Sequence, residues 1–133
     1  MPLITAWAAL ICGTFFMFQT LQVIRARGSA GVSLGDGGDK LLMRRMRGQA
    51  NAAEQMPLTL IAMGLAEMLG APGWALLPLA AVFTVSRLAH GYAFGWLEHN
   101  RPLRFYGMAG SAFSTFCILI LLGVMVLTRS LGG

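Results

Sequence analysis

The sequence predicts an all-α integral membrane protein, folded as a bundle of four transmembrane helices. Of its 133 residues, 56% are hydrophobic and 11% are charged, whereas an ordinary soluble domain carries about 25% charged residues. Several apolar runs exceed the roughly 18 residues that distinguish a membrane span from a buried core helix. Short polar connections separate these runs. We therefore expect residues 1–133 to form a single membrane domain.

The four spans are predicted at residues 3–25, 41–69, 74–96 and 104–128. No positively charged n-region precedes the first, so we expect a retained span and not a cleaved signal peptide. The connection before the second span is rich in glycine, and Asp39 at its end is a candidate N-cap. Pro57 lies inside the second span and is predicted to kink it.

Basic residues gather at one end of the predicted bundle. Four spans place both termini on one side, which carries only Arg129. The opposite side holds Arg25, Arg27, Lys40, Arg44, Arg45, Arg47, Arg101 and Arg104. Because short basic connections stay in the cytoplasm, we expect the first and third connections to be cytoplasmic and both termini to be periplasmic. Short loops and nine arginines to one lysine indicate a bacterial inner-membrane protein.

The net charge of +5 does not indicate nucleic acid as a partner, because no polar domain presents the basic residues to a duplex. Membrane lipid is the expected partner of the apolar surface. Cys12 and Cys117 lie inside apolar runs, without the spacing of a disulfide framework or a metal site. We therefore expect no metal.

One face of the second span is predicted to carry a polar stripe. Arg44, Arg47, Asn51 and Glu54 follow one another at spacings of three, four and three residues, which keeps them within about 80° of one another around a helix. Arg45 points away from this sector and is predicted to face lipid phosphates. Lipid anchoring requires neither an amide nor a carboxylate, so the stripe indicates a binding site.

The third span carries two ionisable residues, Arg87 and His90, on one face. An arginine within a span costs roughly 2.5–3.5 kcal/mol on insertion scales, so it should face protein or a water-filled cavity. We expect Glu54 to pair with Arg87 or with an arginine of the stripe. His90 alone is equally compatible with a structural hydrogen bond, and Arg25 with lipid anchoring.

Together these residues place guanidiniums, an amide and a carboxylate at one end of a helical bundle. Such a cluster suits a small anionic ligand, because arginine binds carboxylates bidentately. Apolar walls beside it would admit a lipophilic small molecule. Tyr92 is either an interfacial aromatic residue or a hydroxyl donor to the ligand.

The layout and two motifs resemble the MAPEG family, the membrane-associated proteins in eicosanoid and glutathione metabolism, and especially its microsomal glutathione transferases. The segment RRMRGQANAAE at residues 44–54 is similar to the family's RxxRAHxNxxE. The segment RLAH at residues 87–90 is similar to the family's RxxH. The resemblance covers nearly the whole chain.

This resemblance implies a homotrimer in which glutathione, a co-substrate, binds between neighbouring subunits near the cytoplasmic face. It implies that Arg104 is the catalytic residue, stabilising the glutathione thiolate, and that Arg44 and Arg87 have structural or supporting roles. The family has a tyrosine at the position of Phe94, and we add Tyr92 because it is close to that position in sequence. The expected substrate-binding residues are therefore Arg25, Arg47, Asn51, Glu54, His90 and Tyr92.

The chain departs from the family pattern at four positions. Gln49 stands where many members have His, Ala50 where some have a further Arg, Phe94 where a Tyr is expected, and Phe105 where some eicosanoid enzymes have Ser. These departures argue against any named eicosanoid reaction. The prediction is a glutathione-dependent transferase or peroxidase acting on lipophilic electrophiles or hydroperoxides. The alternative is a non-catalytic trimer that binds a lipid or another small anion in the same pocket. A transporter would need polar residues across the bilayer, whereas these gather at one end.

Overall fold

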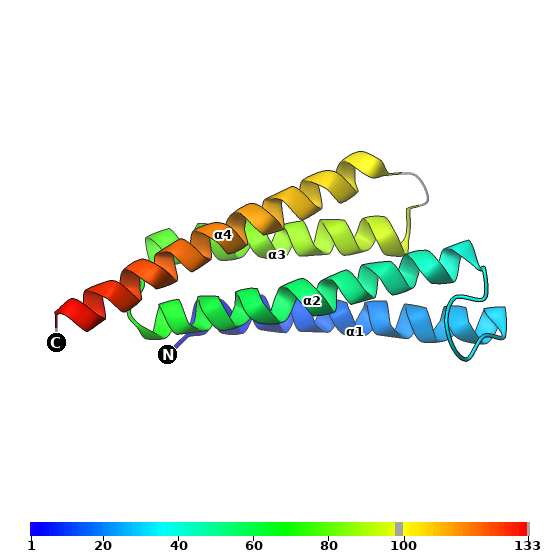
Figure 1. Cartoon of the computed structure of the whole chain (residues 1–133), viewed down its shortest axis with the longest axis horizontal. Coiled ribbons are helices and arrows are strands. Elements are labelled where there is room, and N and C mark those ends of the chain that lie inside the picture. Colours follow the sequence, from blue (N-terminus) through cyan, green and yellow to red (C-terminus); the bar gives the residue numbers. More distant parts are fainter. Residues whose placement is uncertain (98–99, 133) are drawn as a thin grey trace.

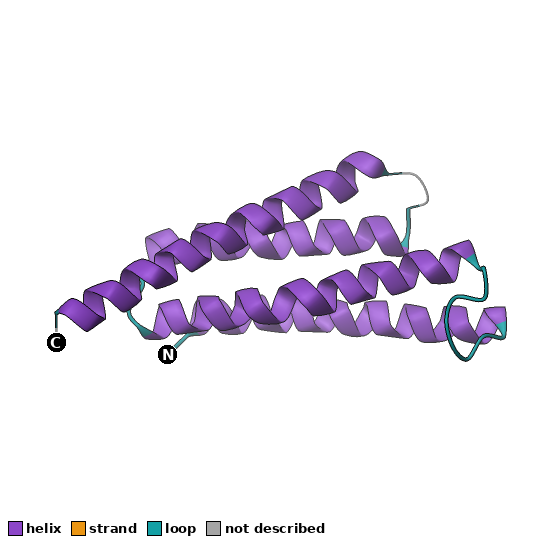
Figure 2. Cartoon of the chain, in the orientation of Figure 1, coloured by secondary structure: helices purple, strands orange, loops and turns teal. Residues whose placement is uncertain are grey.

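The computed structural model describes residues 1–97 and 100–132, and this part of the chain forms helices and no strand (Figure 2). The helices are α1 (Leu3–Ala30), α2 (Lys40–Met68), α3 (Gly73–Gly95) and α4 (Arg101–Leu131). The all-helical prediction is confirmed. Helices α1 and α4 are long and apolar enough to cross a membrane. Helix α2 has a polar first half and α3 carries buried polar residues, so the other two spans stay a prediction.

The helices extend beyond the predicted spans at the more polar end of the molecule. The first span is predicted at residues 3–25, and helix α1 continues beyond it to Ala30, where Gly31 closes the helix in the left-handed conformation at φ 65°. Helix α4 starts at Arg101, three residues before the predicted span, because the Asn100 side chain accepts a hydrogen bond from Leu103 N at 2.9 Å. The length of an apolar run indicates how much of a helix can lie in the hydrocarbon. The helix itself ends where its backbone hydrogen bonds end, which can be several residues further on.

The predicted N-cap of the second helix is confirmed. Asp39 Oδ1 accepts a hydrogen bond from Leu42 N at 2.7 Å, which satisfies one of the free N–H groups in the first turn of α2. Arg27 holds the preceding connection by donating to the carbonyl of Gly35 at 2.9 Å. Helix α2 then runs without interruption through Pro57.

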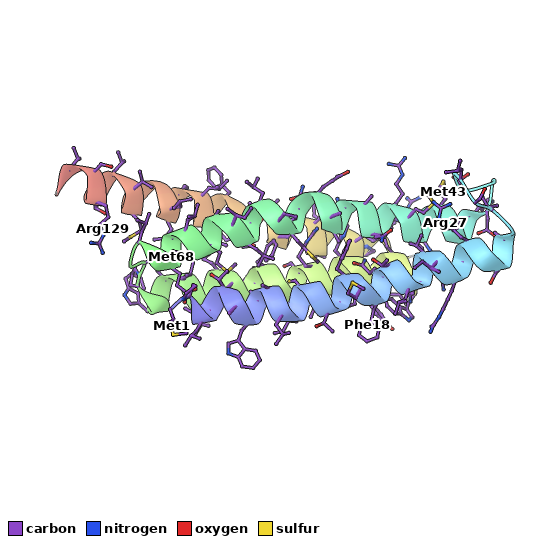
Figure 3. All side chains as sticks on the ribbon, turned by 90° about the horizontal axis from the view of Figure 1, so that it is seen from below. Met1, Phe18, Arg27, Met43, Met68 and Arg129 are labelled. Atoms are coloured by element: carbon purple, nitrogen blue, oxygen red, sulfur yellow. The ribbon has the colours of Figure 1, made fainter. Side chains whose placement is uncertain are left out.

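Helices α2 and α3 form the centre of the bundle. Helix α1 and helix α4 each pack against both of them, and α1 and α4 do not contact one another in the described chain. Both termini and the α2–α3 turn lie at one end, here called the terminal end (Figure 1). The α1–α2 connection, the C-terminal end of α3 and the N-terminal end of α4 lie at the other, the loop end. Arg27 and Met43 mark the loop end, and Met1, Met68 and Arg129 the terminal end (Figure 3).

The apolar core fills the bundle between its middle and the terminal end. Its fully buried side chains come from all four helices, and the largest are Phe83, Met63, Leu76, Ile118 and Cys12. A smaller cluster of Val23, Ala26 and Leu42 joins α1 to α2 at the loop end. The polar stripe of α2 therefore lies on the loop-end side of this apolar core.

A carboxylate from α2 caps α1 at the terminal end. Glu67 accepts hydrogen bonds from Ile4 N at 2.9 Å, from Thr5 N at 2.9 Å and from the Thr5 hydroxyl at 2.8 Å. Pro2, at the N-cap position of α1, makes no side-chain capping bond. Glu67 thus replaces a local cap, and its negative charge also favours the positive end of the α1 dipole.

Replacing Glu67 by alanine should lower the free energy of unfolding by about 1–2 kcal/mol, because three donors lose their acceptor. The measurement is thermal unfolding in detergent, followed by circular dichroism. Thr128→Ala is the control, since the Thr128 hydroxyl is exposed and bonds only within its own helix, to the Met125 carbonyl. Equal midpoints for Glu67→Ala and Thr128→Ala would contradict the capping role.

Candidate functional site

A pocket of about 880 Å³ lies between α2, α3 and α4 at the loop end. Helix α2 contributes most of its wall, α3 contributes two aromatic rings, and α4 closes it from the far side. The lining residues are Lys40, Met43, Arg44, Arg47, Ala50, Asn51, Glu54, His90, Phe94, Arg104 and Met108. Its volume falls within the range of about 300–1,000 Å³ that is usual for small-molecule sites.

The whole polar stripe of α2 faces this pocket. Arg44, Arg47, Asn51 and Glu54 all line it, as their helical spacing predicts. Arg47 and Glu54 are exposed, whereas Arg44 and Asn51 are partly buried. The Nε atom of Arg44 is buried without a hydrogen-bond partner among the described residues, so only the outer end of this guanidinium is free to contact a ligand.

Arg87 lies beneath the pocket and joins three helices. It is only 2% exposed. Its Nη1 atom donates to Asn51 Oδ1 on α2 at 2.8 Å, and its Nη2 atom donates to Ser111 Oγ on α4 at 2.6 Å. Nη2 also approaches the sulfur of Met108 at 3.7 Å. Arg87 thereby holds Asn51 in the pocket wall, although it does not line the pocket itself.

The expected ion pair of Glu54, with Arg87 or with an arginine of the stripe, is wrong. Arg87 is paired with neutral oxygens, and within residues 1–97 and 100–132 the structure has no ion pair that includes Glu54. Asn51 precedes Glu54 by one helical turn and lies at the depth of Arg87. Glu54 remains exposed in the pocket wall, where it can receive a cationic group of a ligand.

Arg104 and two aromatic rings form the α3–α4 side of the pocket. The Arg104 guanidinium lies 4.2 Å from the centroid of the Phe94 ring, a cation–π contact. The Phe94 ring lies 4.9 Å from that of His90, which is buried. Phe94 packs against Gly48 of α2, where a Cβ atom would lie 2.7 Å from the Phe94 Cβ. Gly48 therefore lets the ring reach the pocket.

Two of the expected binding residues lie outside the pocket. Arg25 is exposed on α1, a helix that contributes no pocket wall. Tyr92 is 46% exposed, and its ring stacks on Trp96 at 5.3 Å. Trp96 in turn lies 6.1 Å from Phe15 of α1, so Tyr92 belongs to the α1 side of α3. Arg45, expected at lipid phosphates, instead donates to the Gln22 carbonyl of α1 at 3.4 Å.

Sequence reasoning missed several residues of the site. Lys40, Phe94 and Met108 line the pocket, and Ser111 holds Arg87 from α4. One signal was present for α4, because Met108 and Ser111 follow Arg104 by four and seven residues and so share its face. A serine in an apolar helix is, however, usually a small residue that allows close packing. Nothing in the sequence distinguishes Ser111 from Ser114.

The pocket is strongly cationic. Among the residues that the structure describes, four cations line it, namely Lys40, Arg44, Arg47 and Arg104, against one carboxylate, Glu54. Arg87 adds a buried positive charge below the wall. In the described chain no group of three or more His, Cys, Asp or Glu side chains could hold a metal ion. The geometry thus favours an anionic organic ligand bound by guanidiniums.

The fold and the site are those of a helical membrane protein that has a cation-lined pocket at one end of its bundle. The matching family model is that of the MAPEG family, over residues 4–124. The chain belongs to the MAPEG family, as its motifs predict.

Two relatives have the printed name inner membrane protein YecN. The protein from Escherichia coli strain K12 is 32% identical over 120 residues, which is 90% of this chain and 87% of the relative. The protein from Escherichia coli O6:H1, strain CFT073, matches to the same extent. Together with the two apolar helices, this similarity supports an inner-membrane location.

Gly107 allows α4 to approach α3 next to the pocket. A Cβ atom there would lie 2.8 Å from the backbone nitrogen of His90, so Gly107→Ala should displace one helix and cost about 1–3 kcal/mol of unfolding free energy. Gly123→Ala is the matched control, because its Cβ would meet nothing within 4 Å, and it should be neutral or slightly stabilising. Thermal unfolding in detergent compares them, and a Gly107→Ala variant as stable as Gly123→Ala would contradict the close packing.

Proposed function

We propose that this protein is a membrane-bound, glutathione-dependent transferase or peroxidase that acts on lipophilic electrophiles or hydroperoxides. The observation that carries the proposal is the pocket between α2, α3 and α4, in which four cations, one carboxylate and one amide converge. Membership of the MAPEG family supports it, since the family takes its name in part from glutathione metabolism.

Glutathione complements the charges of the pocket. At neutral pH the tripeptide carries two carboxylates and one ammonium group, and its thiol is uncharged. The two carboxylates suit the guanidiniums of Arg44 and Arg47, which bind such groups with paired hydrogen bonds. The ammonium group suits Glu54, the one carboxylate in the wall. A neutral or cationic ligand would leave most of these cations without a partner.

Arg104 is the residue we propose to activate the thiol. A free thiol has a pKa of about 8.5 and is mostly protonated at neutral pH, so a nearby guanidinium favours the thiolate nucleophile. Arg104 lies on the face of Phe94, an apolar ring. In the transferase reaction the thiolate forms a C–S bond as the leaving group departs. In the peroxidase reaction it attacks a peroxide oxygen, the O–O bond breaks and an alcohol is released. The glutathione sulfenic acid that forms then reacts with a second glutathione to give the disulfide and water.

The lipophilic substrate has a suitable approach beside Arg104. A second hollow of about 480 Å³ is lined by Arg101, Phe105, His90, Phe94 and Arg104, and it shares the last three with the main pocket. Phe105 is 68% exposed and Tyr106 is 70% exposed, so apolar surface continues from the hollow to the outside of the bundle. A membrane-dissolved electrophile could therefore meet the thiolate at Arg104 without crossing the cationic wall.

A homotrimer forms part of the proposal. Arg25 and Tyr92 lie outside the pocket of their own chain, whereas the family resemblance makes Arg25 a glutathione contact. A neighbouring subunit would bring Arg25 to the exposed side of α2. We further propose that all four helices cross the inner membrane, with the basic loop end in the cytoplasm, where glutathione is available.

Titration of the purified protein in detergent with glutathione tests the proposal. We expect saturable binding by calorimetry, together with thiolate formation near neutral pH, read from ultraviolet absorbance. S-methyl glutathione is the matched control ligand, because it should bind without producing thiolate. Absence of binding at millimolar glutathione would overturn the proposal and favour a lipid or another small anion as the ligand.

Arg104→Ala should reduce thiolate formation more than it reduces affinity. Loss of the guanidinium should raise the pKa of the bound thiol by about one unit, which is roughly a tenfold smaller ionisation constant. The pH dependence of thiolate absorbance in saturated protein gives this value, and calorimetry gives the affinity. Arg129→Ala is the control, since Arg129 contacts the Leu69 carbonyl at the terminal end. An unchanged thiol pKa in Arg104→Ala would contradict the assigned role.

A further inference from the structure

Asn51 contacts both Arg87 and the pocket, and the contact with Arg87 fixes how its side-chain amide is turned. An arginine guanidinium has only donors. The Asn51 atom that lies 2.8 Å from Arg87 Nη1 must therefore be the carbonyl oxygen, Oδ1. This assignment follows from chemistry, although oxygen and nitrogen of an amide look alike in most structures.

The amide nitrogen of Asn51 is then left for the pocket. Asn51 is a pocket-lining residue, and its Nδ2 atom makes no hydrogen bond within the described residues. Nδ2 is not one of the buried polar atoms, so it is accessible from the pocket. An accessible N–H pair in a pocket wall recognises acceptors, such as carboxylate or carbonyl oxygens, and rejects donors such as an ammonium group.

Ser111 holds Arg87 in the position that turns Asn51. Its hydroxyl oxygen accepts from Arg87 Nη2 at 2.6 Å and donates to the Met108 carbonyl at 3.0 Å. Ser111 is fully buried on α4 and does not line the pocket. The positive charge of Arg87 also polarises the Asn51 amide, which strengthens its N–H groups as donors.

We propose that Arg87 and Ser111 are positioning residues that set the specificity of the pocket: they occupy the oxygen of Asn51 and present its N–H groups to a carboxylate or carbonyl oxygen of the ligand. The inference rests on the proposed function, with glutathione as the probe. Ser111 acts through Arg87, and Arg87 acts through Asn51, so Ser111 has a role in binding without touching the ligand.

Asn51→Asp tests the direction of the amide. The carboxylate keeps an acceptor for Arg87, so the fold is retained, but it replaces the N–H groups with an oxygen. We expect Asn51→Ala to weaken glutathione binding about tenfold and Asn51→Asp on the order of a hundredfold, because the new charge opposes an acceptor of the ligand. If Asn51→Asp binds glutathione as tightly as the natural protein, Asn51 faces a donor and the proposal is wrong.

Ser111→Ala tests the relay without touching the pocket. We expect about fivefold weaker glutathione binding, because Arg87 loses one of its two oxygen partners. Ser114→Ala is the matched control, since Ser114 is equally buried on α4 but bonds only to carbonyls of its own helix. In an Asn51→Ala background Ser111→Ala should have no further effect. An equal loss in both backgrounds, or in Ser114→Ala, would overturn the relay.

A spectroscopic measurement separates this inference from the proposed function. Asn51 and Asn100 are the two asparagines of the sequence, so ¹⁵N-asparagine labelling gives two side-chain amide signals, which Asn100→Ser assigns. Ser111→Ala should shift the Asn51 signal in ligand-free protein, and Ser114→Ala should not. A shift without glutathione binding would retain the relay and reject the ligand. Binding without a shift would retain the ligand and reject the relay.

Discussion

The Arg87 guanidinium is the group that the helical bundle must accommodate. Its side chain is only 2% exposed. Burying a cation without partners costs far more folding free energy than burying a paired one. Oxygen atoms from α2 and α4 meet it from two sides. This requirement fixes the register of three helices at one depth and brings Asn51 to the pocket wall. The apolar core below needs only volume complementarity.

The same charge shapes the pocket above it. Four lining cations and Arg87 repel one another, and Glu54 is the one carboxylate among the described lining residues. Any anion that binds relieves this repulsion, so the site favours ligands of negative charge before individual contacts are considered. Ligand binding would accordingly stabilise the loop end of the fold, because a ligand that binds only the folded state shifts its stability. The terminal end, held by the Glu67 cap, has its own stabilising contacts.

Sequence periodicity predicted most of what depends on one helix and little of what depends on two. The stripe from Arg44 to Glu54 and the Asp39 cap follow from spacing and local chemistry, and the structure has both. The partner of Arg87 depends on the relative depth of two helices, so Glu54 was predicted where Asn51 and Ser111 occur. Tyr92 was included among the binding residues because it is close to Phe94 in sequence, but two residues along a helix rotate a side chain by about 200°, to another face.

The departure at Phe94 bears on how the proposed chemistry would work. A tyrosine there would place a hydroxyl near the thiol, and Phe94 offers only a ring face to Arg104. Stabilisation of a thiolate would then depend on the positive charge of Arg104. The neighbouring His90, whose ring lies 4.9 Å from that of Phe94, is almost fully buried. A cation held against an apolar face has lost part of its hydration, which strengthens its attraction for an incoming anion. The absence of the tyrosine hydroxyl therefore need not prevent thiol activation, but it leaves this single guanidinium as the group on which activation depends.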